Sequence, residues 1–236
     1  MTSNSFEQEI KERYKQAKKK IKDAAEKSNR DLDDIKLVAV GKEQPLEKLK
    51  FVRKLGVFAL GESRVQELRD KDEESSSTNN WHFVGHLQRN KVKYLARMEN
   101  CKLIHSLDSL RLAREINKRA GKNNRVMSVL VQVNVARDES KFGFMPEELL
   151  PFLDKAADLE NISLEGLMTL VPYFEDSEKA RPYFKQLVDL QTEAEESGYH
   201  LPELSMGMTN DYQVAIEEGA TMIRLGREIF GPRNYE

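Results

Sequence analysis

The alternation of short apolar runs with helical stretches is the feature that most constrains the fold of this chain. Eight runs are rich in residues that favour strands, and a helical pattern follows each of them except the last. The runs are LVAV (37–40), VFALG (57–61), HFVG (82–85), LIHSL (103–107), SVLVQVNV (128–135), ISLEGLM (162–168), ELSM (203–206) and TMIRLG (221–226). Such alternation predicts a parallel sheet, and eight units close naturally into a (β/α)8 TIM-type barrel, an α/β fold.

A further helix is predicted before the first strand, over residues 1–28. Its apolar residues recur every three or four positions, as Phe6, Ile10, Tyr14, Ala17, Ile21 and Ala24. A length of 236 residues is close to the roughly 250 that such a barrel needs. We therefore expect residues 1–236 to form a single barrel domain on which this helix packs. The polar segment DEESSSTNN (72–80) is predicted to be a flexible surface loop.

The charge and cysteine content narrow the class of protein. The chain has 38 basic and 40 acidic side chains, which leaves no general attraction for nucleic acid or for an anionic membrane. Its first residues lack the apolar core of a signal peptide, and no apolar run approaches the roughly 18 residues that span a bilayer. The single cysteine, Cys101, is expected to be a buried small hydrophobe. A cytoplasmic location fits these features best.

Candidate functional residues are sought where the strands end, because barrels of this type place their active sites there. Lys42 follows the first strand, where partial desolvation would make its amine a nucleophile. Gly207 follows the seventh strand and lets the backbone approach a ligand closely. Thr209 is predicted to cap the next helix, whose first N–H groups could bind phosphate. Each feature also has an ordinary explanation: strand-end lysines usually reach solvent, and a capped turn needs no ligand.

The end of the eighth strand completes this candidate site. Arg224-Leu225-Gly226-Arg227 precedes a short EIFG segment, which resembles the small extra helix of barrel phosphate sites. Because strands eight and one are neighbours in a closed barrel, Arg224 and Lys42 are expected to face one cavity. A phosphate cradle, an amine and a guanidinium together suit an aromatic phosphate that carries an aldehyde. A sugar-phosphate aldehyde fits these residues almost as well.

Other residues have weaker claims to function. His82 and His86 flank a strand end at a spacing that suits metal ligands only on a helix, so a structural or hydrogen-bonding role is favoured. The basic stretch QRNKVKYLAR (88–97) is expected to be a solvated helix face. Lys141, Phe142 and Phe144 follow the fifth strand and either border the site or pack in the core.

A family resemblance bears on this ambiguity. The segments VAVGKEQP, GESRVQE, WHFVGHLQRNKV, HSLD, LVQVNVARDESKFGF, GLMTL, LSMGMTNDYQVAIEEGATMIRLG and IFGPRNY resemble, in matching order, the YggS/PROSC family of pyridoxal phosphate homeostasis proteins. The resemblance implies a fold-type III barrel, related to the N-terminal domain of alanine racemase, that binds pyridoxal 5′-phosphate (PLP). It implies that Lys42 holds PLP as a Schiff base, that Ser205 and Met206 hold its phosphate, and that Gly226 and Arg227 complete the phosphate site. Arg224 matches the arginine near the pyridine nitrogen or the phosphate.

Three positions depart from the pattern of this family. Gly41 stands where serine or threonine is usual, Ser63 where asparagine is usual, and Arg227 where threonine is usual. These departures bear on the affinity for PLP.

The family resemblance implies a PLP carrier or buffer with no strong catalytic activity, a monomer that serves PLP-dependent apoenzymes. An amino-acid racemase is the main alternative. Racemisation needs an acid–base group on each face of the substrate, and Lys42 supplies only one. The second group in alanine racemase is a partner subunit's tyrosine, and no tyrosine of this chain is an evident counterpart. A Schiff-base aldolase that uses Lys42 directly on a sugar phosphate is a third possibility.

Overall fold

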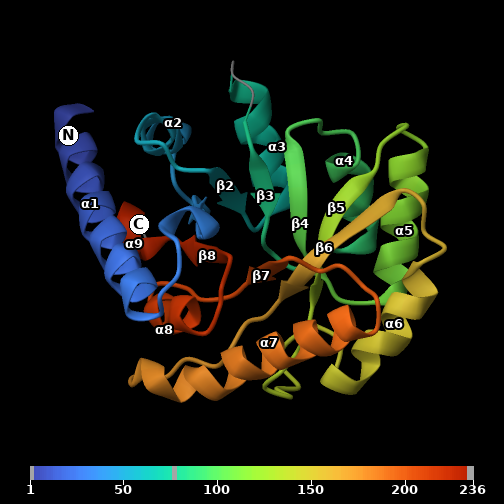
Figure 1. The fold of residues 1–236 in the computed structure, drawn as a ribbon. Helices are drawn as coiled ribbons and strands as arrows, with labels where there is room; N and C mark the ends of the chain where they lie inside the picture. The colour runs from blue at the N-terminus through green and yellow to red at the C-terminus, as the bar shows by residue number, and fades with distance from the viewer. Residues whose placement is uncertain (1–2, 76–78, 233–236) are drawn as a thin grey trace.

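The computed structural model describes residues 3–75 and 79–232, and it confirms the predicted barrel. Eight parallel strands close in chain order, with β8 paired to β1 (Figure 1). The strands are β1 (Lys36–Val40), β2 (Ala59–Glu62), β3 (Trp81–Phe83), β4 (Cys101–Leu107), β5 (Met127–Gln132), β6 (Ile162–Met168), β7 (Glu203–Ser205) and β8 (Met222–Leu225). Every predicted run contains most of a strand, and β6 has the predicted bounds.

Helices surround the barrel on the outside of the strands. The α-helices are α1 (Ser3–Lys27), α2 (Leu46–Lys54), α3 (Val65–Glu74), α4 (Val92–Leu95), α5 (Leu110–Gly121), α6 (Leu149–Ala156), α7 (Arg181–Glu196), α8 (Tyr212–Glu217) and α9 (Arg227–Phe230). Short 3-10 turns are η1 (Leu32–Asp34), η2 (Arg89–Lys91), η3 (Pro146–Glu148) and η4 (Ser177–Ala180). None of the helices within the described ranges combines the length and apolarity that crossing a bilayer would require.

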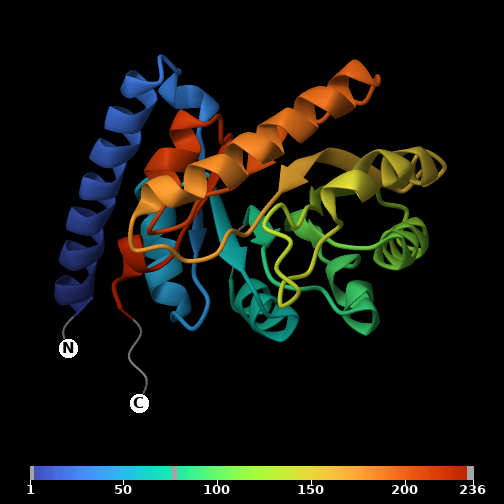
Figure 2. The same ribbon diagram turned by 90° about the horizontal axis from the view of Figure 1, so that it is seen from below.

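The predicted N-terminal helix packs on the last elements of the barrel. Figure 2 shows α1 running beside α8 and α9, so the two ends of the chain meet on one flank. The predicted stripe faces inward, with Ile10, Ala17, Ile21 and Ala24 buried. Lys20 pairs with Glu228 at 2.8 Å, which adds a polar link between α1 and α9.

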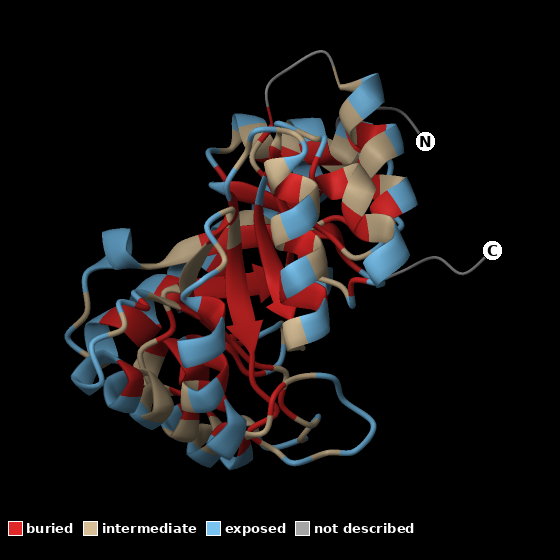
Figure 3. Cartoon of the chain, turned by 90° about the vertical axis from the view of Figure 1, so that its right-hand side faces the viewer, coloured by how far each residue is buried: buried red, intermediate tan, exposed pale blue. Residues whose placement is uncertain are grey.

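The hydrophobic core has two layers, and strands form the buried centre of the molecule (Figure 3). The larger layer lies between the strands and the helices. A smaller cluster consists of Leu103, Leu130, Met168 and Met222. Cys101 is buried as predicted, and this burial raises the pKa of its thiol to about 12. Such a thiol stays protonated and packs as an apolar group.

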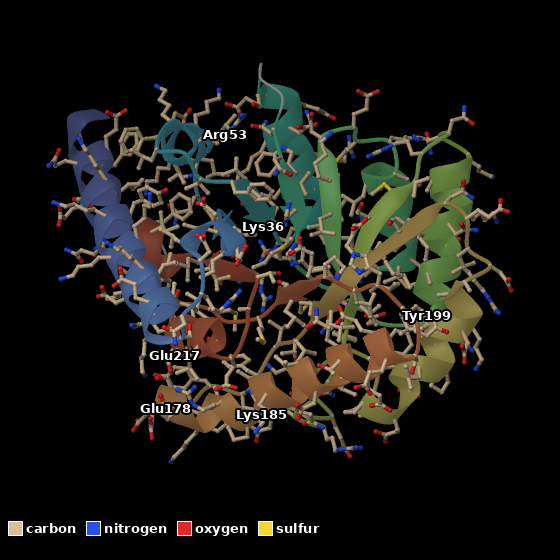
Figure 4. All side chains as sticks on the ribbon, in the orientation of Figure 1. Lys36, Arg53, Glu178, Lys185, Tyr199 and Glu217 are labelled. Carbon is tan, nitrogen blue, oxygen red and sulfur yellow. The ribbon has the colours of Figure 1, made fainter. Side chains whose placement is uncertain are left out.

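The prediction of a surface loop over residues 72–80 was wrong at both ends. Residues 72–74 belong to α3, and Asp72 accepts hydrogen bonds from the Trp81 indole at 2.8 Å and from Asn100 at 2.9 Å. Asn79 is buried and accepts a hydrogen bond from Arg53 of α2, which is labelled in Figure 4. Polar composition misled the prediction because these side chains find buried partners. The middle of the segment, residues 76–78, lies outside the described residues.

Candidate functional site

Lys42 lies two residues beyond the end of β1, at the C-terminal mouth of the barrel. The turn that carries it continues the sheet for one more bond, since the Gly41 N–H donates to the Gly61 carbonyl at 2.9 Å. Lys42 itself is half-buried. Because β1 lies between β2 and β8, groups from both neighbouring strands flank this turn.

Arg224 lies in β8, opposite Val38 of β1, and is 4% exposed. One guanidinium nitrogen donates to the Ser205 hydroxyl at 2.5 Å, and the other donates to the Thr169 carbonyl at 2.8 Å. These contacts tie Arg224 to the ends of β6 and β7. Burial lowers the pKa of Arg224 to about 10, an effect that Asp211 opposes, so the side chain remains a cation at neutral pH.

A chain of buried polar side chains extends from Arg224 across the barrel. The Ser205 hydroxyl lies 2.8 Å from Nδ1 of His105, and Nε2 of His105 lies 2.9 Å from Nδ1 of His82. All three side chains are at most 3% exposed. Burial lowers the pKa of His82 to about 3, helped by Lys36, and places that of His105 well below its usual value. Both imidazoles are therefore neutral, as a continuous hydrogen-bonded chain in an enclosed space requires.

The positions of the protons along these hydrogen-bonded side chains leave the O–H donor of Ser205 unused. A hydroxyl offers one donor and two acceptor positions. When His82 donates to His105 and His105 donates to Ser205, the serine oxygen accepts from both His105 and Arg224. In that arrangement neither contact uses the O–H of Ser205. An ion pair between Lys36 (Figure 4) and Glu203 lies at the opposite end of the barrel, where β1 and β7 begin.

The loops after β7 and β8 have the predicted glycines but not the predicted cap. The N-cap of α8 is Asp211, not Thr209, because the loop turns two residues further before the helix begins. The Asp211 carboxylate accepts from the Met208 N–H at 2.7 Å. Gly207 has a φ of +86°, and a Cβ there would lie 2.6 Å from Ala215, so only glycine fits.

The remaining predicted phosphate residues lie along the same rim. Gly226 is the N-cap of α9, directly after β8, and the side chain of Arg227 is exposed. The first N–H groups of a helix have no partner within the helix and point outward from its start. Met206 is buried, and its N–H already donates to the Met222 carbonyl at 3.1 Å.

Two of the positions that depart from the family pattern, Gly41 and Ser63, lie in closely packed parts of the backbone. A Cβ at Gly41 would lie 2.7 Å from a methyl carbon of Leu49, a fully buried residue of α2, so this chain combines a glycine with a close-packed leucine. Ser63 lies on the loop after β2, whose backbone packs against Gly85. A Cβ at Gly85 would lie 2.1 Å from the Ser63 carbonyl oxygen. The Ser63 loop is thus held against the loop after β3.

The weaker candidates from the sequence do not form one site, although two of them are in contact. His82 joins the buried chain, whereas His86 is exposed and lies 3.0 Å from Asp108. Phe142 is also exposed and stacks on His86 with ring centroids 3.6 Å apart, while Phe144 is buried against Phe152. Of the two phenylalanines, only Phe144 packs in the core, whereas Phe142 lies on the surface. Within residues 3–75 and 79–232 no three metal-binding side chains are grouped as an ion would require.

The burial of the Arg224 cation tests whether these residues fit a phosphorylated aldehyde. Among the described residues, no carboxylate lies within ion-pair distance of this buried cation. A buried charge without a close counter-charge is unfavourable. Asp211 acts on Arg224 only from beyond ion-pair distance, and an anionic ligand at the mouth would supply a closer partner. The strand that carries Arg224 adjoins the strand that leads to the Lys42 amine. The donor set therefore fits a ligand with both an anionic group and a carbonyl.

Comparison with known proteins gives consistent similarities. A family model described as the N-terminal domain of alanine racemase matches residues 13–234. The chain is 45% identical to the pyridoxal phosphate homeostasis protein of Aquifex aeolicus, over 95% of this chain and 98% of that protein. An unknown protein from Bifidobacterium adolescentis has a TM-score of 0.89 and 29% identity, with 97% of each chain covered. PipY of Synechococcus elongatus, solved with PLP bound, has a TM-score of 0.75 and 32% identity over 84% of this chain and 93% of that chain.

Proposed function

Because this chain belongs to the pyridoxal phosphate homeostasis proteins, a family built on the alanine racemase N-terminal domain, we propose that it binds PLP at the mouth of its barrel and takes part in PLP homeostasis. The observation that carries the proposal is a half-buried Lys42 just after β1, next to strand β8 with its buried Arg224, which no described carboxylate contacts at ion-pair distance. When bound, PLP supplies an aldehyde that a primary amine converts to a Schiff base.

Each residue of the site has a part in this proposal. Lys42 provides the amine that anchors the cofactor. Gly226 and Arg227 offer N–H groups at the start of α9 to the phosphate, and Ser205 and Met206 approach it from the end of β7. The Ser205 oxygen accepts from His105 and Arg224, so its O–H can donate to the phosphate.

Arg224 has an electrostatic effect on any ligand ring nitrogen placed beside it. A cation disfavours protonation of that nitrogen, which makes the ring a poorer electron sink than one that faces a carboxylate.

The setting of the protein is part of the same proposal. We place it in the cytoplasm as a monomer that supplies PLP-dependent apoenzymes. The near-neutral charge and the single buried cysteine support this location, and the exposure of the Lys42 turn supports exchange of the cofactor.

The test is to add PLP to the purified protein, reduce it with borohydride and map the modified peptide. We expect a coloured protein whose reduced adduct lies on Lys42, with colour and adduct both lost in Lys42→Ala. Lys185→Ala is the matched control, since Lys185 is an exposed residue of α7 and is expected to leave both unchanged. A protein that stays colourless with PLP would refute the proposal. Exchange of the α-hydrogen of free amino acids in D2O would instead favour the racemase.

A further inference from the structure

A buried ammonium group lies behind the turn that carries Lys42. It belongs to Lys71 of α3, which is 7% exposed. Its Nζ donates to the Glu62 carboxylate at 2.6 Å, to the Glu67 carboxylate at 2.7 Å and to the Gly41 carbonyl at 2.8 Å. An ammonium group has three donors, so each of them has an acceptor in this cluster.

The cluster of Glu62, Glu67 and Lys71 holds both peptide groups of Lys42. The Gly41 carbonyl belongs to the peptide that precedes Lys42 and accepts from Lys71. The Glu43 N–H belongs to the peptide that follows Lys42 and donates to Glu67 at 2.6 Å. Because Glu67 and Lys71 are themselves paired, the two sides of Lys42 are fixed relative to each other.

The backbone held in this way has an unfavourable conformation. Glu43 has a φ of +63°, in the left-handed region that residues other than glycine seldom adopt. Such a conformation persists only where the surrounding structure determines it. The Glu43 side chain is exposed and forms an ion pair with Arg64 at 3.5 Å, so buried packing around that side chain is not what fixes the backbone. The bond from its N–H to Glu67 restrains it directly.

Stability alone does not account for this cluster. Glu62 is fully buried, and its second carboxylate oxygen accepts no hydrogen bond from the described residues. Burial raises the pKa of Glu62 to about 7 although Lys71 lowers it. Buried ion pairs with an unsatisfied atom are often less favourable than apolar packing of the same volume. The feature that the cluster does specify is the path of the chain through Lys42.

We propose that Lys71, Glu67 and Glu62 are positioning residues that fix the Lys42 turn so that its amine meets the ligand at the barrel mouth. This inference rests on the proposed function, in which Lys42 is the anchor for PLP. The three side chains act through the backbone of Lys42. Without them the turn occupies other conformations, and PLP affinity falls in proportion to the competent fraction.

The first test is Glu67→Ala. Glu67 is partly exposed, so the fold tolerates its truncation better than that of Lys71 or Glu62. We expect PLP to bind about tenfold more weakly in an equilibrium titration. We also expect faster hydrogen exchange in residues 41–45 of the PLP-free protein, with little change in the other strand ends.

Conservative and control variants separate positioning from general damage. Glu67→Gln keeps an oxygen that can accept from the Glu43 N–H, and we expect most of the affinity to return. Arg69→Met removes an ion pair with Glu73 on the same helix without touching the turn, and it should change neither readout. The double variant Glu62→Gln, Lys71→Met removes both buried charges and leaves the Gly41 carbonyl with the Gln44 N–H as its remaining donor. It should weaken binding and speed exchange as Glu67→Ala does.

The combination of readouts decides the inference. Wild-type affinity and wild-type exchange in Glu67→Ala would overturn it. Weaker binding with unchanged exchange would also overturn it, because Glu67 would then act on the ligand and not on the turn. If the wild type binds no PLP, the proposed function fails by itself. The exchange of residues 41–45 then still shows whether the cluster holds the turn.

Discussion

Stability against acid should depend on the two buried histidines of the barrel interior. Burial lowers the pKa of His82 to about 3 and that of His105 well below its usual value of 6.5. In the unfolded chain both imidazoles regain a pKa near 6.5 and take up protons at pH 5. In the folded protein these two imidazoles take up none there. The stability that these groups contribute is therefore complete above pH 6.5 and is lost as the pH falls toward 3.

The size of this loss follows from the pKa difference. Between pH 7 and pH 5 an unfolded-state histidine of pKa 6.5 gains protonation free energy of about 2 kcal/mol that the neutral folded His82 does not share. Glu62 acts in the opposite direction, because its raised pKa lets the folded protein bind a proton that the unfolded chain still lacks. The comparison of wild type with His82→Asn cancels the Glu62 contribution and isolates that of the histidine.

His82→Asn is the suitable change because the amide nitrogen of asparagine can donate to His105 in place of Nδ1. Urea unfolding at pH 7 and pH 5 can be followed through the fluorescence of Trp81, the single tryptophan, which is fully buried. We expect the acid-induced loss of unfolding free energy to be about 2 kcal/mol smaller in the variant than in the wild type. His200→Asn, at an exposed position, should keep the wild-type difference. If His82→Asn also keeps the wild-type difference between pH 7 and pH 5, the buried imidazole of His82 is not neutral in the folded protein and the reasoning fails.

Two further substitutions test the packing around the site. Gly41→Ser places a Cβ 2.7 Å from buried Leu49, and urea unfolding should show a loss of about 1–3 kcal/mol; unchanged stability would mean that α2 yields without cost. Arg224→Lys replaces a two-nitrogen fork by one ammonium, so either Ser205 or Thr169 loses its donor. The expected loss is about 1–3 kcal/mol by the same method, and a variant as stable as the wild type would contradict the proposed contacts.

The fold was predictable because its strands are local, nearly continuous apolar runs. LVAV and ISLEGLM are bounded by polar or turn residues, and the structure extends or trims most runs by one or two positions. The run 128–135 was overestimated more, since Val133 leaves the strand and pairs with Phe144 in an isolated bridge. Strand ends depend on the neighbouring strand, which the local sequence does not contain.

The buried polar groups were not predictable in the same way. His82 and His105 are 23 positions apart and meet only through the register of β3 and β4. Glu67 and Lys71 have the spacing of an ordinary exposed helix pair. The one usable signal was Glu62, a carboxylate directly after the apolar residues of β2. The Thr209 cap failed because the loop continues to Asp211, whose carboxylate bonds back to the Met208 N–H before the helix begins.

Closure of the barrel and formation of the site are one structural event. Lys42 is held from outside the barrel by α3, whereas Arg224 is held from inside by groups at the ends of β6 and β7. These two halves of the site come together only because Val38 of the first strand pairs with Arg224 of the last. A ligand that joins the Lys42 amine to the rim after β8 therefore bridges the seam between β1 and β8. Such a ligand favours the closed barrel in proportion to its affinity, so cofactor binding and barrel stability are thermodynamically linked.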